Sequence, residues 1–541
     1  MWHNHARLTL FVEKNLFQDR RTMIIRNASF FALAVASTLS LGCVVGDELS
    51  AEDDLTSVTA RSRSLAFDGY VYVSPNASDS EILSAVRSQT QTAFGALRTA
   101  EISVNNRELK AVDVKTFTKT KVTVIDTAKP SLPGTPMLKV RYRYTDDAVV
   151  PKSMAKRSAI GLAVLSPDYG KQTQRILKEC TANDSHAQEF SSSLWYVFDP
   201  SLSACRTAMA AEQKLIDAAS EKLNDPTTQI SKEELKRLYL ATTVKLGADK
   251  TNKGLSYPEY DRLFSGGVAK DKLVIGLVNG YLDHGTRDAS DSGYSEWMDT
   301  LRQVSKVRNF KLASIEPVED LSTFSVNGKT VKSASFQDFI AWEVDGTLPA
   351  GLAYSDRDAL KKAVGAKLVQ HWVTLEAPVT VKIGPAAEKP FTIQILTYFG
   401  SESSSGPHKR AIKNSDVFVY NGHSYIGYGP LDPSNFSAAD FPSSYQLLFI
   451  DGCVSYNYYE KDYIPLKVGG TQNLDLITNG LEAPSWDSGN AVGALLAKMI
   501  DGSMSSYATL LKAASSTDSL RVVDGEVDNT FNPTKTSILV K

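Results

Sequence analysis

The sequence predicts an α/β protein whose C-terminal half holds a mostly parallel sheet in an α/β/α sandwich, preceded by an α+β region. Two patterns predict this fold class. After residue 269, short apolar runs alternate with amphipathic helical stretches, which is typical of parallel strands buried on both faces. Before that point, several strands alternate apolar and polar residues, as in a sheet with one solvated face. The composition, 42% hydrophobic and 22% charged, is that of an ordinary globular chain.

The N-terminal segment, residues 1–42, is interpreted as a secretory signal peptide. Its apolar stretch, residues 28–41, follows several arginines and is shorter than the ~20 residues that a membrane span requires. The ending Leu-Ser-Leu-Gly-Cys resembles a bacterial lipobox, with Ser40 where Leu is usual. The resemblance implies a lipid on Cys43 that anchors the protein in the bacterial cell envelope, facing the periplasm or at the cell surface. A secreted protein is the alternative.

The next stretch and the cysteines fit export. Residues 43–64 are polar and acidic, which predicts a solvated tether. Of the four cysteines, Cys180 and Cys205 flank a polar loop and are the expected disulfide in an oxidising compartment. Cys453 is then left unpaired, and an odd cysteine in an exported protein calls for an explanation.

Residues 65–268 are expected to form the α+β domain. Ser78 and Glu81 form a capping-box pattern that predicts the start of a helix. No catalytic constellation stands out in this region. Strands are expected at residues 67–73, 112–114, 122–124, 138–144 and 158–165, and helical structure at residues 210–246.

Residues 269–541 are expected to form the α/β domain. Its first apolar run, residues 273–278, is followed by a helical stripe that begins at Trp297, and this order predicts a strand–helix–strand unit. Further helices are expected at residues 358–372 and 492–500. Further strands are expected at residues 310–315, 391–398, 416–420, 445–450 and 474–478.

Two of these strands end in residues that carry chemistry. One runs into Asn-Gly-His423-Ser, and the next runs into Asp-Gly-Cys453-Val. Ligands and reacting groups of α/β sheets gather at the carboxyl ends of strands, so neighbouring parallel strands would place His423 beside Cys453. An imidazole can take the thiol proton and later protonate a leaving group. An inert buried thiol and a hydrogen-bonded turn histidine are the alternative interpretations.

The two runs, DVFVYNGHS and LLFIDGCVS, resemble the caspase-like cysteine peptidases, a group that includes caspases, gingipains, legumains and CHAT proteases. The resemblance covers about residues 270–515. It implies that Cys453 is the nucleophile, that His423 is the base or orienting partner, and that the backbone N–H groups of Ser424 and Cys453 stabilise the oxyanion. Ser424 departs from the usual Gly after the histidine, and Gly452 departs from the usual Ala before the cysteine. His284 is the competing partner or a pocket residue, and Gly422 and Asp451 are further pocket candidates.

The leading hypothesis is therefore a lipid-anchored cysteine endopeptidase that acts on a peptide or protein substrate. The alternative is a non-catalytic envelope lipoprotein that keeps the fold as a binding module. A third class is a structural protein of the envelope. The net charge of −2 argues against a nucleic-acid partner, and the seven histidines show no ligand spacing, so neither a metal nor another cofactor is predicted.

Overall fold

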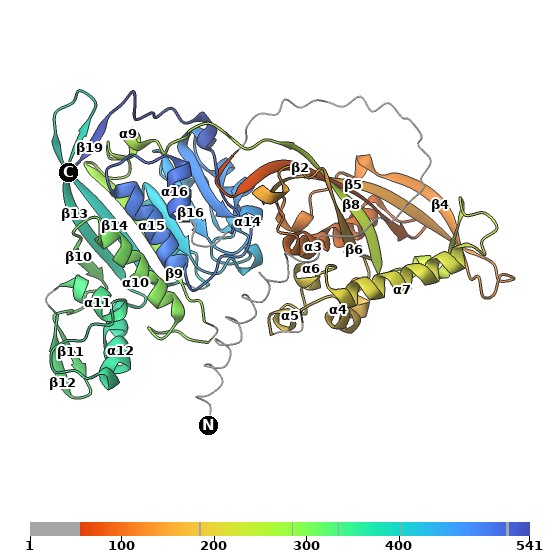
Figure 1. Cartoon of the computed structure of the whole chain (residues 1–541), viewed down its shortest axis with the longest axis horizontal. Coiled ribbons are helices and arrows are strands. Elements are labelled where there is room, and N and C mark those ends of the chain that lie inside the picture. The colour runs from red at the N-terminus through yellow and green to blue at the C-terminus, as the bar shows by residue number, and fades with distance from the viewer. Residues whose placement is uncertain (1–54, 183–184, 284, 334, 402, 515–518) are drawn as a thin grey trace. The chain divides into compact units, whose positions relative to one another are not determined.

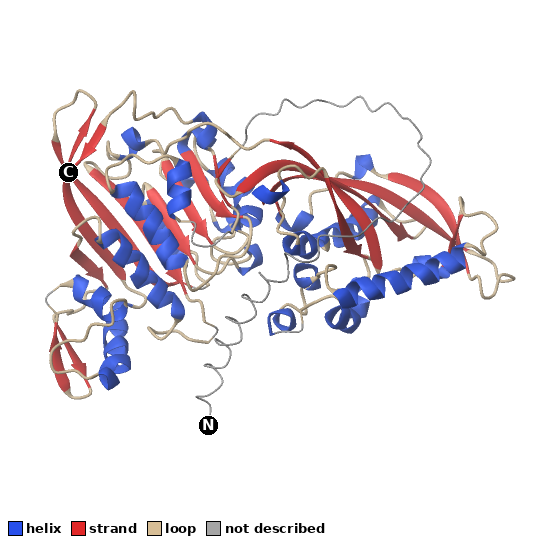
Figure 2. Cartoon of the chain, in the orientation of Figure 1, coloured by secondary structure: helices blue, strands red, loops and turns tan. Residues whose placement is uncertain are grey.

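The computed structural model describes residues 55–541, apart from residues 183–184, 284, 334, 402 and 515–518. The described residues form a ten-stranded, a seven-stranded and a two-stranded sheet with helices packed on them, so the protein is a mixed α/β protein (Figure 2). We call the ten-stranded sheet the large sheet and the seven-stranded sheet the small sheet. Among the described helices, none is both long and apolar enough to cross a membrane.

The large sheet is parallel in the middle and antiparallel at both sides. Its strands are β1 (Thr56–Ser57), β9 (Lys272–Gly280), β10 (Lys311–Glu316), β13 (Trp372–Ile383), β14 (Lys389–Ser401), β15 (Val417–Asn421), β16 (Gln446–Asp451), β17 (Leu474–Asn479), β18 (Arg521–Asp524) and β19 (Ile538–Val540). Their order is β1-β18-β17-β16-β15-β9-β14-β13-β10, and β19 pairs with β13. The pairs from β17 across to β14 are parallel, which confirms the expected neighbouring parallel strands.

Helices cover both faces of the large sheet. They include α10 (Ser292–Ser305), α13 (Gly406–Lys413), α14 (Ser455–Tyr463), α15 (Ser488–Ile500) and α16 (Tyr507–Ala513). Helices α10 and α15 pack side by side over one face (Figure 1). Successive residues of a strand point to opposite faces. Accordingly, Val417 and Val419 of β15 join the core under α10 and α15, whereas Phe418 and Tyr420 join the core on the other face.

The outer part of the large sheet differs from the expectation. Residues 369–372 were expected to extend a helix, but α12 (Arg357–Leu368) ends before them and Trp372 begins β13. Strand β13 alternates buried and less buried residues and forms an antiparallel hairpin with β14. This long hairpin adds antiparallel pairing to a sheet that was expected to be mostly parallel. The two-stranded sheet of β11 (Thr323–Val326) and β12 (Lys329–Lys332) contacts α12, and α11 (Phe336–Glu343) contacts β10 and α12.

The small sheet lies in the α+β region. Its strands are β2 (Ala60–Val73), β3 (Ser103–Val104), β4 (Thr118–Ile125), β5 (Thr135–Pro151), β6 (Ala159–Leu165), β7 (Gln229–Ser231) and β8 (Tyr239–Asp249). The order is β6-β8-β2-β5-β4-β7, and β3 pairs with β5. Strand β8 replaces the helix expected up to residue 246, because its leucines are spaced for a strand paired with β2 and β6. Residues 112–114 were expected as a strand, and Val114 instead begins a short 3-10 turn.

The helices of the α+β region include α2 and α3, which pack on the small sheet. Helix α2 begins with the expected capping box, in which Ser78 and Glu81 bond each other's backbone. The helices are α2 (Asp79–Gln91), α3 (Ala93–Thr99), α4 (Thr173–Glu179), α5 (Ser185–Glu189), α6 (Leu194–Val197), α7 (Ser203–Ser220), α8 (Lys232–Leu235) and α9 (Tyr260–Leu263).

A continuous chain segment and a shared core cluster connect the large sheet and the small sheet. Strand β2 begins at Ala60, and Thr56–Ser57 pairs with β18, so residues 56–64 are mostly strand rather than the expected solvated tether. The physical reason is that the apolar side chain of Leu55 is buried with Ala60 and Val522 in a small apolar cluster. One core cluster also contains Phe94 of α3 together with Tyr458 of α14. The α+β region therefore packs directly on the α/β region.

The expected disulfide between Cys180 and Cys205 is present, with an S–S distance of 2.04 Å. It closes a loop of 25 residues and joins the end of α4 to the start of α7. Replacing both cysteines with serine is expected to lower the free energy of unfolding by roughly 3 kcal/mol, because the open loop gains conformational entropy when the chain unfolds. Urea denaturation of the two proteins measures the difference. An unchanged midpoint would contradict the loop-entropy argument.

Candidate active site

Four neighbouring parallel strands carry the candidate site at their carboxyl ends. Strand β9 leads to Leu282, β15 to His423, β16 to Cys453 and β17 to Glu482. The strand order β17-β16-β15-β9 places these residues in the same sequence along one edge of the large sheet. Asn421 and Asp451 are register partners at the ends of β15 and β16, and His423 and Cys453 each follow two residues later. The tips that sequence reasoning singled out are therefore neighbours.

Cys453 lies in a tight turn between β16 and α14. Val454, the next residue, has a φ of 52°, which is uncommon for a β-branched residue and marks a strained turn. The hydroxyl of Ser455 donates to the carbonyl of Ile450 over 2.8 Å, and the N–H of Val454 donates to the carbonyl of Leu481 over 3.0 Å. These bonds fix the turn from the strand side and from the neighbouring loop.

Gly452 explains one departure from the caspase-like pattern. A Cβ atom at this position would lie 3.2 Å from the carbonyl oxygen of Gly422 and 3.5 Å from the Cβ of Ser424. An alanine would therefore push against the turn that carries His423. The two turns approach each other closely because position 452 is glycine.

The thiol of Cys453 is half-buried and is not part of a disulfide. Its sulfur donates to the carbonyl of Ala483 over 3.9 Å. Burial raises the pKa of Cys453 to about 12, and the carboxylate of Glu482 acts in the same direction. The thiol is consequently protonated at neutral pH in this arrangement, and a nucleophilic role requires a base that removes the proton.

His423 is oriented by a backbone carbonyl. Its Nε2 lies 3.0 Å from the carbonyl oxygen of Leu282, which can only accept, so Nε2 carries the proton. The neutral ring then has Nδ1 as its basic nitrogen. An oriented imidazole with one basic nitrogen is what general-base chemistry requires.

Two buried tyrosines hold the histidine turn. Tyr420 donates to the carbonyl of His423 over 2.9 Å, and Tyr459 donates to the carbonyl of Ser424 over 2.7 Å. A side chain at Gly422 would meet the Tyr420 hydroxyl at 2.4 Å, so this position has no room for one. Gly422 thus admits the tyrosine that supports the turn.

The Asp451 side chain is buried in a network of hydrogen bonds. Its carboxylate accepts from Arg521 over 2.8 Å and from Asn479 over 2.6 Å, and all three side chains are buried. Arg521 also donates to the side-chain oxygen of Asn479 over 2.8 Å. This network ties the ends of β16, β17 and β18 together beneath the Cys453 turn, and nothing places Asp451 in a substrate pocket.

The remaining predicted residues lie outside the part of the chain that the structure describes. His284, the competing histidine, and Cys43, the expected lipidation site, are outside the described residues, as is the expected signal peptide. Within the described residues, no group of three or more His, Cys, Asp or Glu side chains is arranged to hold a metal ion.

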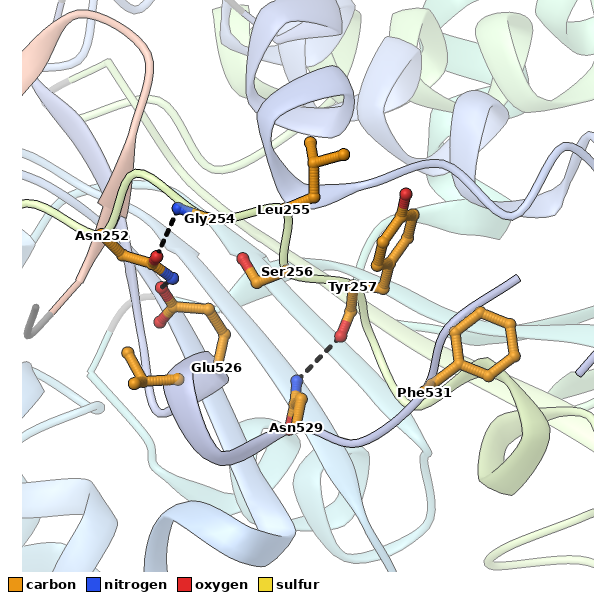
Figure 3. Close-up of a pocket in the computed structure, with 9 residues that line it drawn as sticks. Asn252, Gly254, Leu255, Ser256, Tyr257, Glu526, Asn529 and Phe531 are labelled. Carbon is orange, nitrogen blue, oxygen red and sulfur yellow. Dashed lines mark hydrogen bonds between the residues drawn. The ribbon is translucent and has the colours of Figure 1, made fainter. Parts of the chain in front are cut away.

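A cavity of about 580 Å³ lies far from this edge, beside residues that follow β18 (Figure 3). The Asn529 amide at its wall donates to the carbonyl of Tyr257 over 2.9 Å and to Asp475 at the start of β17 over 2.6 Å. The start of β17 is the opposite edge of the sheet from Cys453. The cavity therefore belongs to a different surface. Its lining is Asn252, Gly254, Leu255, Ser256, Tyr257, Glu526, Val527, Asn529 and Phe531.

Comparisons of the chain with protein-family models, with curated proteins and with solved structures found no match.

Proposed function

We propose that the protein is a cysteine peptidase with a caspase-like arrangement, in which Cys453 is the nucleophile and His423 the general base. The observation that carries the proposal is the in-register parallel pairing of β15 with β16, which brings the two residues to adjacent turns. The orientation of the His423 imidazole supports the same proposal. The carbonyl of Leu282 accepts from Nε2, so Nδ1 is the nitrogen that can take a proton. The substrate is a peptide or a protein.

The chemistry follows from these groups. His423 Nδ1 takes the proton of the Cys453 thiol as the sulfur attacks the carbonyl carbon of the scissile peptide. The imidazolium then gives that proton to the leaving amine, and an acyl group remains on the sulfur. Water, deprotonated by the same imidazole, hydrolyses the thioester and releases the acid. The backbone N–H groups of Ser424 and Cys453 lie on the two facing turns, where a developing oxyanion would need donors.

The resting arrangement requires one adjustment. The thiol donates to Ala483, and its pKa is raised to about 12, so the proton transfer to His423 must occur as substrate enters. Hydrogen bonds between catalytic groups are commonly long before substrate binds and shorten in the complex. A modest rotation of the Cys453 side chain away from Ala483 is the change that the proposal needs.

A non-catalytic binding module is the second candidate, and the same pKa favours it. A thiol that is protonated and bonded to a carbonyl is chemically inert. In that case the carboxyl edge would bind a partner without cleaving it. Hydrolysis that depends on His423 separates the two candidates.

Substitution of His423 by alanine is expected to lower kcat/KM for peptide hydrolysis by roughly 10²–10⁴-fold, because general-base assistance to the thiol is lost. A peptide library is incubated with the protein, and mass spectrometry identifies a cleaved peptide. That peptide then serves as the substrate in the kinetic assay. His371→Gln serves as the matched control, since His371 lies before β13 and bonds the carbonyl of Val369. Equal rates for His423→Ala and the control would remove His423 from the mechanism.

We also propose that the protein is exported and carries a lipid on Cys43, which would hold it at the membrane. The disulfide between Cys180 and Cys205 supports export, because such bonds persist in oxidising compartments. The lipid anchor itself rests on the sequence pattern around Cys43.

A further inference from the structure

A side chain from the α+β region reaches the candidate site. Arg98, near the end of α3, forms an ion pair with Glu482, which follows β17 at the carboxyl edge of the large sheet. The guanidinium lies over the ring of Tyr196 at 4.7 Å from its centroid, and the Tyr196 hydroxyl donates to Glu482 over 3.3 Å. The carboxylate of Glu482 is thus surrounded by a cation and an aromatic face from the α+β region.

This ion pair is next to the nucleophile. Glu482 directly precedes Ala483, whose carbonyl accepts from the Cys453 thiol. The Glu482 carboxylate raises the pKa of that thiol, and the Arg98 guanidinium lowers it. The thiol in turn contributes to the raised pKa of Tyr196. A substrate bound across the Cys453 turn would therefore lie within reach of the Glu482 carboxylate.

We propose that Glu482 is the binding group for a basic side chain of the substrate, and that Arg98 occupies it in the resting protein. This inference rests on the proposed peptidase function and names its substrate class: peptides with arginine, or a similar cation, before the scissile bond. The α+β region then acts as an internal competitor of the substrate.

Two properties of the pair fit exchange rather than a purely structural bond. The Glu482 side chain is 37% exposed, so its carboxylate can be reached from solvent beside Arg98. An incoming guanidinium can make the same ion pair with the carboxylate and the same stacking on Tyr196 that Arg98 makes. The Glu482 carboxylate and the Tyr196 ring thus form a site that fits a guanidinium group, and the Arg98 side chain occupies it.

The experiment compares two fluorogenic peptide amides that differ only in arginine or citrulline before the scissile bond. Citrulline has nearly the same shape and no charge. Removing the competitor in Arg98→Ala is expected to raise kcat/KM for the arginine peptide at least about tenfold, with a change under about threefold for the citrulline peptide. Adding Glu482→Gln to Arg98→Ala is expected to erase the preference for arginine.

Arg107→Ala is the matched control. Arg107 also joins the α+β region to the α/β region, through Asp432 and the carbonyl of Tyr458, but it does not contact Glu482. General loosening of the interface would activate this variant as well, and such a result would overturn the inference. Arg98→Gln, which keeps most of the side-chain volume, repeats the test if Arg98→Ala does not fold.

Failure of the inference can be told apart from failure of the proposed function. If hydrolysis is observed but shows no preference for arginine over citrulline in Arg98→Ala, the basic-side-chain site is wrong and the peptidase remains. If no variant hydrolyses either peptide, calorimetry with N-acetylarginine amide decides. Binding to Arg98→Ala that is lost in Arg98→Ala/Glu482→Gln supports the site without the hydrolase, and no binding overturns the inference.

Discussion

Substitution of Cys453 by alanine is expected to abolish peptide hydrolysis, with a loss of at least about 10³-fold in kcat. The reason is that no other nucleophile replaces the sulfur at the end of β16, and His423 alone only positions or deprotonates a group. The assay uses the library-derived substrate and a single batch of wild-type and variant protein. Hydrolysis that survives at the wild-type rate would remove Cys453 from the mechanism.

The fold of Cys453→Ala should be unchanged, which makes the comparison interpretable. The thiol is half-buried, and its one hydrogen bond, to Ala483 at 3.9 Å, is weak. Most surface or partly buried substitutions of this size change the free energy of unfolding by less than about 1 kcal/mol. A loss of the cooperative unfolding transition would mean that the variant reports on folding rather than on catalysis.

Substitution of Arg521 by methionine is expected to have the largest effect on stability, a loss of about 3–5 kcal/mol in the free energy of unfolding. Arg521 is 5% exposed and pairs with Asp451, which is 1% exposed. Without the guanidinium, the Asp451 carboxylate stays buried and keeps the hydrogen bond from the Asn479 amide. A buried charge without its partner lowers the stability of the fold, and the segment affected is the turn before Cys453.

Urea denaturation measures the effect, and a second variant tests its cause. Adding Asp451→Asn to Arg521→Met removes the buried charge, so the double variant is expected to recover part of the lost stability. A double variant that is less stable than Arg521→Met would contradict the electrostatic explanation. A single-variant loss below about 1 kcal/mol would show that the pair contributes little.

The part of the site that lies on central strands was predictable from the sequence. Short apolar runs such as those of β15 and β16 can only be buried on both faces, and strands of that kind pair in parallel with their carboxyl ends on one edge. The order His423 then Cys453, each two residues beyond a strand, follows from that register. The disulfide was predictable because, of the four cysteines, Cys180 and Cys205 flank a common loop.

The missed elements depend on contacts between segments far apart in the sequence. The spacing of Leu235, Leu238 and Leu240 suggested a helix, but Leu240 lies in β8, and only the pairing of β8 with β2 and β6 identifies this segment as a strand. The carbonyl of Leu282 is a backbone group, so no residue type marks it as the partner of His423. The pairing of Arg98 with Glu482 crosses 384 positions, and no local pattern announces it.

The central claim is that Cys453 is a nucleophile activated by His423. It is tested most directly by treating the folded protein with a peptidyl acyloxymethyl ketone, which alkylates a catalytic thiol, and locating the adduct by mass spectrometry. We predict labelling of Cys453 in the wild-type protein and at least about tenfold slower labelling in His423→Ala, because the thiolate is the reactive form. An unlabelled Cys453, or equal labelling in both proteins, would contradict the claim.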